Sequence, residues 1–189
     1  ENLDIIVINV GENKVYLNKG SFDFVELGPG LGGSSSKAAE LADINGDQHI
    51  DLVVVNSEKN KNTIWLNNST GFFTPTNYGF GVKANDKNLA LGDFDNDNKI
   101  DIFVTNEDEN DTLWMHAQSG YFSQSEKLGN SGSKDVSIGD LNGNGYLDAF
   151  VVNTNSSNRV WFNMKNGTFK RSAQTFKYEN STSVALADI

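Results

Sequence analysis

The sequence predicts an all-β protein made of β-propeller blades, each with four antiparallel strands. Acidic loops recur along the 189-residue chain with a period of about 47 to 50 residues, and a short apolar segment follows each loop. Connections rich in Asn, Gly and Ser, with only two prolines, join these segments. Such short strands and turns are typical of all-β proteins, and this period is typical of propellers and solenoids. The approximate repeats are residues 1–42, 43–92, 93–139 and 140–189.

The first strand of each repeat follows the acidic loop and is apolar on successive residues. This applies to Ile5–Ile8 and to Leu52–Val55. Because neighbouring residues of a strand point to opposite faces, we expect both faces of this strand to be covered. Blades that stack face to face around an axis provide such cover, whereas the edge of a β-sandwich would alternate.

The second strand carries an aromatic residue at the same place in every repeat, namely Tyr16, Trp65, Trp114 and Trp161. These side chains are large enough to fill the space between blades. Sugar-binding platforms are the alternative, but equivalent places in every repeat favour packing. The third strand is expected around Phe22, Phe72–Phe73, Tyr121–Phe122 and Phe169, and a small-residue fourth strand over 37–42, 87–92, 134–139 and 182–187. We interpret the glycine-rich segment Gly28–Ser36 as a plain loop between strands.

Three nine-residue loops each gather hard oxygen donors at their first, third, fifth and ninth places. Carboxylates packed this closely repel one another unless a cation lies between them. With a backbone carbonyl from the seventh place, each loop approaches the six to eight oxygens that calcium prefers. The sequence thus predicts about three Ca²⁺ sites. Their ligands are Asp43, Asn45, Asp47, His49 and Asp51; Asp93, Asp95, Asp97, Lys99 and Asp101; and Asp140, Asn142, Asn144, Tyr146 and Asp148.

Two other interpretations of these loops are less favoured. An EF-hand needs Gly at its sixth place and Glu at its twelfth, but the twelfth places here hold Val54, Val104 and Val151. Ordinary turns are also rich in Asp, Asn and Gly, but three loops with one spacing favour calcium. By count of carboxylates, affinity should fall from the Asp93 loop to the Asp43 loop and then to the Asp140 loop.

At these residues the chain resembles the FG-GAP/VCBS repeats of integrin-α-like, calcium-binding β-propellers. The resemblance covers essentially the whole chain, and its most specific parts are the three loops, the D-L-V-V-V-N type strand and the segment Trp65–Thr74. It implies calcium held between strands of a blade. The Phe-Gly and Gly-Ala-Pro marks are missing, and Asn142 and Asn144 stand where acids are common. Members usually have about seven blades, so we expect four repeats of a larger propeller, although a closure of the two chain ends into one blade is the alternative.

The composition restricts the partners and the location. A net charge of −10 argues against nucleic acid and anionic membranes, and no apolar run approaches the roughly 18 residues of a transmembrane helix. Because the chain starts at Glu1 rather than Met, we interpret it as a piece of a longer protein. It has no cysteine, which leaves the redox compartment open. Because calcium sites of extracellular modules work at millimolar calcium, we expect an extracellular or cell-surface location. Six N-x-S/T sequons make a glycoprotein conceivable: Asn67, Asn68, Asn110, Asn155, Asn166 and Asn180.

No catalytic constellation is recognisable. His49 lies inside a calcium loop, and His116 stands where other repeats carry Asn18, Asn67 and Asn163, which is expected of a surface position. Without Cys or a G-x-S-x-G motif, we expect no enzyme. The sequence favours an adhesion or recognition module for a protein or glycan. The alternatives are a self-assembling subunit of an extracellular fibre and an accessory domain of a secreted enzyme.

Overall fold

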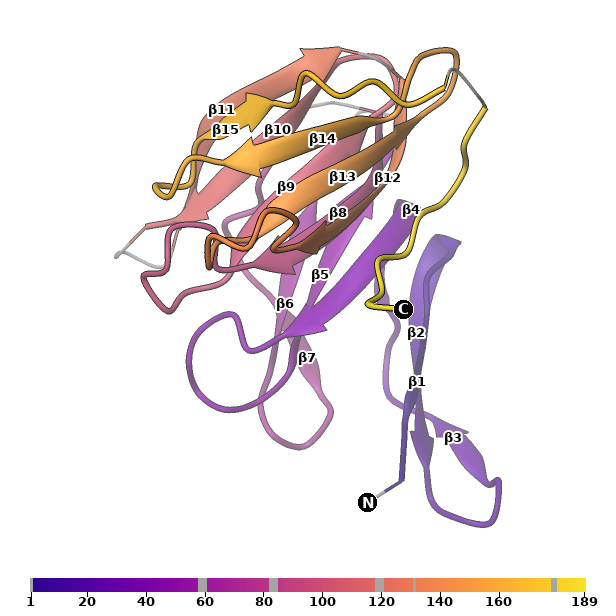
Figure 1. Ribbon diagram of the computed structural model, residues 1–189. Helices are drawn as coiled ribbons and strands as arrows, with labels where there is room; N and C mark the ends of the chain where they lie inside the picture. Colours follow the sequence, from indigo (N-terminus) through magenta and orange to yellow (C-terminus); the bar gives the residue numbers. More distant parts are fainter. Residues whose placement is uncertain (1, 58–60, 82–84, 118–120, 131, 178–179) are drawn as a thin grey trace.

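The computed structural model describes residues 2–57, 61–81, 85–117, 121–130, 132–177 and 180–189, and in these ranges it contains strands and turns but no helix (Figure 1). The all-β prediction is confirmed. The strands are β1 (Ile5–Val7), β2 (Val10–Asn18), β3 (Phe24–Glu26), β4 (Leu31–Ala42), β5 (Asp51–Asn56), β6 (Thr63–Asn67), β7 (Phe73–Pro75), β8 (Asp86–Gly92), β9 (Asp101–Asn106), β10 (Asn110–His116), β11 (Phe122–Asn130), β12 (Ser133–Gly139), β13 (Asp148–Asn153), β14 (Arg159–Asn163) and β15 (Phe169–Arg171).

Each propeller blade is an antiparallel meander. Counted after an N-terminal unit of β1 to β3, the second sheet has the order β4-β5-β6-β7, the third sheet is β8-β9-β10-β11, and the fourth sheet is β12-β13-β14-β15. The small-residue segment before each acidic loop is the first strand of its sheet, since it pairs with the strand that follows the loop. An N-terminal unit, β1 to β3, precedes the second sheet.

Strand β4 takes part in two blades. Its first residues pair with Val10–Asn13 of β2, and its later residues, up to Ala42, pair with β5. The N-terminal unit and the second sheet are therefore joined into one seven-stranded sheet. The segment Gly28–Ser36, expected to be a loop, is instead strand from Leu31 onward, because β2 extends far enough to bond it.

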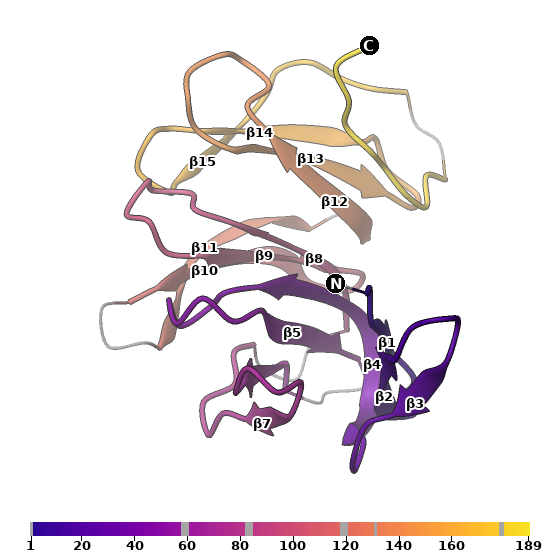
Figure 2. The same ribbon diagram turned by 90° about the horizontal axis from the view of Figure 1, so that it is seen from below.

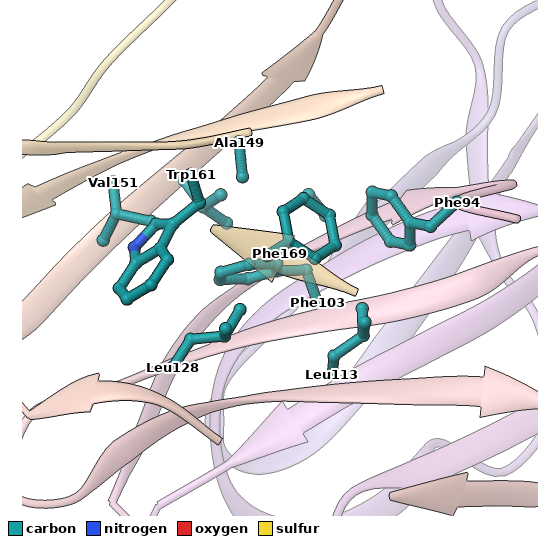
Figure 3. Close-up of a cluster of buried hydrophobic side chains, with 10 residues drawn as sticks. Phe94, Phe103, Leu113, Leu128, Ala149, Val151, Trp161 and Phe169 are labelled. Atoms are coloured by element: carbon teal, nitrogen blue, oxygen red, sulfur yellow. The ribbon is translucent and has the colours of Figure 1, made fainter. Parts of the chain in front are cut away.

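The sheets stack face to face, with the first strands β4, β8 and β12 next to one another (Figure 2). Buried side chains fill the space between successive sheets. Between the third and fourth sheets, Phe103, Leu113 and Leu128 face Val151, Trp161 and Phe169 (Figure 3). This stacking of four-stranded antiparallel sheets is a β-propeller arrangement, and it is consistent with part of a larger propeller.

The strand after the acidic loop is covered on both faces in the second sheet, as predicted. Leu52 and Val54 pack toward the N-terminal unit, while Val53 and Val55 pack toward the third sheet. The same expectation is wrong for Ile5–Ile8. Ile6 and Ile8 pack inward, but Ile5 and Val7 remain 44% and 37% exposed, because no sheet of the described structure lies against that face.

The three recurrent tryptophans pack between blades. Trp161 is buried in the core between the third and fourth sheets. The half-buried Trp65 packs against the cluster between the N-terminal unit and the second sheet, and the half-buried Trp114 packs against the cluster between the second and third sheets. Tyr16 is half-buried on β2. The indole N–H groups of Trp65 and Trp114 donate to Thr63 and Thr112 two residues earlier, at 3.1 and 2.9 Å. These partners at the sheet surface satisfy the polar end of each indole.

A chain of buried polar side chains crosses the blades at the strand ends opposite the acidic loops. In each case a side chain on the third strand of one unit, or directly before it, bonds a side chain at the start of the next unit. Asn13 donates to Ser36 at 3.0 Å, Asn62 donates to Asp86 at 2.7 Å, and Ser133 donates to Asp111 at 2.8 Å. Asn158 donates in the same way to Ser181 at 2.9 Å. We call these contacts the interblade polar chain.

The interblade polar chain continues within each blade through an asparagine at the end of the second strand. Asn106 donates its side-chain amide to Asp86 at 2.8 Å and its backbone N–H to Asp111 at 3.0 Å. Asn56 and Asn153 occupy the same place. Asn56 accepts from the Ser36 hydroxyl at 2.9 Å, and Oδ1 of Asn153 lies 3.0 Å from the Ser133 hydroxyl, whose single proton it shares with Asp111. Buried polar groups thus find partners in the neighbouring blade, which fixes how the sheets dock.

Candidate metal centre

The three acidic loops occupy the same place in successive sheets. They connect β4 to β5, β8 to β9 and β12 to β13, and so lie at one end of each blade. The fourth and sixth places of every loop have positive φ, between 60° and 84°. These places hold Gly46 and Gln48, Asn96 and Asn98, and Gly143 and Gly145. Glycine and asparagine tolerate this left-handed conformation best, which explains their recurrence there.

The aspartate at the first place organises the turn through backbone N–H groups. Asp43 accepts from Gly46, Asp47 and Gln48 at 2.8 to 3.1 Å, and Asp140 accepts from Gly143, Asn144 and Gly145 at 2.8 to 3.0 Å. Asp93 accepts from Asp97 and Asn98 at 3.0 and 2.8 Å. The loop closes on this carboxylate as an Asx turn does.

The aspartate at the ninth place is buried and joins the loop to a third strand. Asp51, Asp101 and Asp148 are at most 1% exposed. Each accepts one N–H from the second residue of its loop at 3.0 Å and one from the end of the third strand of its sheet at 2.8 Å. Asp4 accepts the N–H of Asn18 in the same way. These bonds hold the carboxylate in one position, and each takes up one of its oxygens.

The second loop brings its carboxylates closest together. Within the described residues, Asp93, Asp95 and Asp101 form the one group of three acids whose oxygen atoms lie within 4.8 Å of one another. Burial, with smaller contributions from Asp95 and Asp97, raises the pKa of Asp101 to about 6, against the lowering effect of the two N–H groups that it accepts. Burial first, and then Asp97, also raises the pKa of Asp95. A cation between these oxygens would reverse both shifts, since opposite charge favours the ionised form.

The first and third loops contain fewer acids and use amides in their place. Asn45 donates its amide to Asp47 at 2.9 Å, and Asn142 donates to Asp148 at 2.9 Å. Burial raises the pKa of Asp51 in the first loop. The amide of Asn45 lowers the pKa of Asp47, and the backbone N–H of Gly145 lowers that of Asp140. The side chains of all three loops offer hard oxygen ligands. Because the second loop has the most carboxylates, its residues fit a calcium ion best.

The remaining predicted ligands also lie in these turns. The backbone N–H groups of His49, Lys99 and Tyr146 donate to the residue two places earlier at 2.8 or 2.9 Å. The His49 ring lies 3.1 Å from Asp47, and the Lys99 ammonium donates to Asp97 at 2.8 Å. Lys99 thereby lowers the pKa of Asp97.

His116 is not the surface residue that the sequence led us to expect. Its ring stacks on Phe122 with centroids 4.7 Å apart, its Nδ1 atom is buried, and burial lowers its pKa. Its backbone N–H makes the bond to Asp101 that Asn163 makes to Asp148. The sequence reasoning missed this role of Asn18, Asn67, His116 and Asn163. The available signal was a nearly constant separation, because each of these residues follows the ninth-place aspartate of its repeat by 14 to 16 residues.

Comparison with known proteins agrees with this geometry. A family model described as FG-GAP-like repeat matches residues 1–54, 43–104, 93–151 and 140–189, so that each match includes one or two of the acidic loops or their ends. A search of curated proteins gave no match. No helix long and apolar enough to cross a membrane was found among the described residues. Four successive matches cover the whole chain, which therefore belongs to the FG-GAP-like repeat family.

Proposed function

We propose that this chain is a calcium-stabilised, non-catalytic propeller region that works by binding a protein or a glycan. The cluster of Asp93, Asp95 and Asp101 carries the proposal, because three carboxylates this close favour a divalent cation. The first and third loops repeat the same backbone turn with fewer acids.

Calcium would be held by the side-chain oxygens of the first, third, fifth and ninth places, with the seventh-place carbonyl. When bound, it neutralises the loop and links the first two strands of each blade. The chain's own contribution is positional: the first-place aspartate shapes the turn, and the ninth-place aspartate ties it to the third strand. The metal would act as a structural element.

We place this function outside the cell, where calcium is abundant enough for sites of moderate affinity. Four of the sequon asparagines are exposed, namely Asn68, Asn155, Asn166 and Asn180. In a glycosylating host, these four would be the favoured acceptors.

Calcium titration by calorimetry, combined with thermal unfolding, tests the proposal. We expect saturable binding and a higher Tm with calcium than with excess chelator. The Asp95→Ala variant should lose more affinity than Asn142→Ala, because it removes a charge from the most acidic loop. Equal losses would overturn the ranking, and an identical Tm in calcium and in chelator would overturn the proposal.

A further inference from the structure

Four Asn-Gly pairs occur in the chain, and the structure places them in two different settings. Three belong to the acidic loops: Asn45-Gly46, Asn142-Gly143 and Asn144-Gly145. The fourth, Asn166-Gly167, lies in the hairpin between β14 and β15. Asn-Gly pairs can lose ammonia without an enzyme, because glycine has no Cβ to hinder attack of its backbone nitrogen on the asparagine side chain. The setting decides whether that nitrogen is available.

In the acidic loops the glycine nitrogens are engaged. Gly46 donates its N–H to Asp43, and Gly143 and Gly145 donate to Asp140, all at 2.8 Å. Each bond directs the N–H toward a carboxylate that fixes the turn. Attack on the neighbouring asparagine would require this bond to break and the loop to open, so the folded loops protect their asparagines.

At Asn166 the nitrogen of the following glycine is not engaged in this way. The asparagine side chain is exposed, and the N–H of the neighbouring Gly167, a buried residue, has no acceptor among the described residues. The side-chain oxygen of Asn166 accepts two hydrogen bonds from Thr168, at 3.2 Å from the backbone nitrogen and at 2.6 Å from Oγ1. Two donors on this oxygen would stabilise the negative charge that develops there when Cγ is attacked.

We propose that Asn166 is a site of spontaneous deamidation. The Gly167 nitrogen bonds to Cγ of Asn166 and gives up its proton to water. The Cγ–Nδ2 bond then breaks, ammonia leaves, and a cyclic succinimide forms. Water opens the ring at either carbonyl and gives aspartate or isoaspartate, so the sequence of steps needs no reactant except water.

The hairpin lies against the second acidic loop, so the modification has a neighbour to affect. A Cβ placed on Gly167 would lie 3.5 Å from Cβ of Asp95 and 2.7 Å from Cε of Met115. Isoaspartate lengthens the backbone beside this contact, and either product adds a negative charge near the most acidic loop. Deamidation at Asn166 therefore changes calcium binding by that loop, a consequence that rests on the proposed function.

The β6–β7 hairpin supplies an internal control. Asn68 accepts from the backbone nitrogen and Oγ1 of Thr70 at 3.2 and 2.6 Å, the same distances as at Asn166. Its next residue is Ser69, with φ of 71°, where glycine would fit without strain. Asn68 stands two places earlier in its hairpin than Asn166, but the bonds on its side-chain oxygen are the same and only the following residue differs in type. Ser69→Gly should therefore turn Asn68 into a second site.

The test is peptide mapping by mass spectrometry after the folded, calcium-loaded chain, expressed in bacteria, has stood at mildly alkaline pH. We expect Asn166 to convert at least about tenfold faster than Asn45, Asn142 and Asn144, and Ser69→Gly to make Asn68 react at a similar rate. Thr168→Val, which removes one donor, should slow Asn166 about tenfold. Equal rates at all four Asn-Gly pairs, or an unreactive Asn68 in Ser69→Gly, would overturn the proposal.

Calorimetric calcium titration of fresh and fully deamidated chain separates this inference from the proposed function. A changed affinity in the deamidated chain, absent from an aged Asn166→Gln control, supports the link to the Asp95 loop. An unchanged affinity refutes that link but leaves the modification site in place. A fresh chain that does not bind calcium refutes the proposed function, while the mass spectra still decide whether Asn166 deamidates.

Discussion

Asp111 is the residue of the interblade polar chain that departs most from its equivalents. Asn13, Asn62 and Asn158 stand at the same place in the other units, and each accepts a backbone N–H through Oδ1 as Asp111 does. Asp111 is 2% exposed, and burial raises its pKa from 3.8 to about 7, against the opposing effect of its hydrogen bonds and of Arg159. An ionised carboxylate at this buried place therefore lowers the stability of the folded state at neutral pH.

The Asp111→Asn variant is expected to be more stable than the natural chain above about pH 7 and to lose part of the pH dependence. Between about pH 4 and pH 7 the folded state keeps the proton that the unfolded state releases, so the stability of the natural chain falls as pH rises through this window. The gain should be of the order of a few kcal/mol and should vanish below about pH 4. Urea unfolding at about pH 5 and about pH 8 measures it. Parallel pH profiles for both chains would contradict the assignment.

At the scale of elements, the ninth-place aspartate joins three segments of one blade. Asp148 accepts the N–H groups of Leu141 and Asn163 through its two oxygens, at 3.0 and 2.8 Å. Both donors are backbone N–H groups of the chain itself. The residue therefore has a structural role in addition to its predicted role as a ligand.

The Asp148→Asn variant should lose about 1–3 kcal/mol of stability in chelator as well as in calcium, because its amide nitrogen leaves one buried N–H unsatisfied. Asp95→Asn is the matched control, since its side chain accepts one backbone N–H and can still do so through the amide oxygen. We expect that control to weaken calcium binding and to leave the stability in chelator nearly unchanged. Chemical denaturation of both variants in both buffers gives the comparison. A loss for Asp148→Asn in calcium alone would show that the residue acts solely as a ligand.

At the scale of the whole molecule, complementary polar pairs set which blade follows which. Asn62 donates to Asp86, whereas Asp111 accepts from Ser133. An acid next to an acid would leave two buried carboxylates facing each other. Each junction pairs an acceptor with a donor. Side-chain complementarity therefore helps to determine which blades are neighbours, in addition to the connectivity of the chain.

The Asn62→Asp variant should lose about 3 kcal/mol or more, because it places an unpaired carboxylate beside Asp86. Adding Asp86→Ser recreates the Asp–Ser pair found at Asp111 and Ser133 and should restore most of the loss. The coupling energy from a double-mutant cycle in urea should be about 2 kcal/mol. Additive effects of the two substitutions would refute pairing across this junction.

The blades and loops could be predicted because their signals are local. The apolar run at Leu52–Val55 and the nine-residue spacing from Asp43 to Asp51 each lie in one short stretch of sequence. The interblade polar chain could not be predicted, since Asn62 and Asp86 are 24 residues apart and their equivalents differ in chemistry. The burial of His116 was missed for a similar reason, because it depends on Phe122 across a hairpin.

Strand β4 links the N-terminal unit and the second sheet mechanically. Its hydrogen bonds run to β2 at one end and to β5 at the other, so neither unit can separate as a rigid body without tearing a continuous ladder. Among the described strands no ladder joins the second sheet to the third or the third sheet to the fourth, and side chains hold these sheets together. Under a pulling force the chain should therefore yield first at these two side-chain interfaces, with the two N-terminal units extending together afterwards.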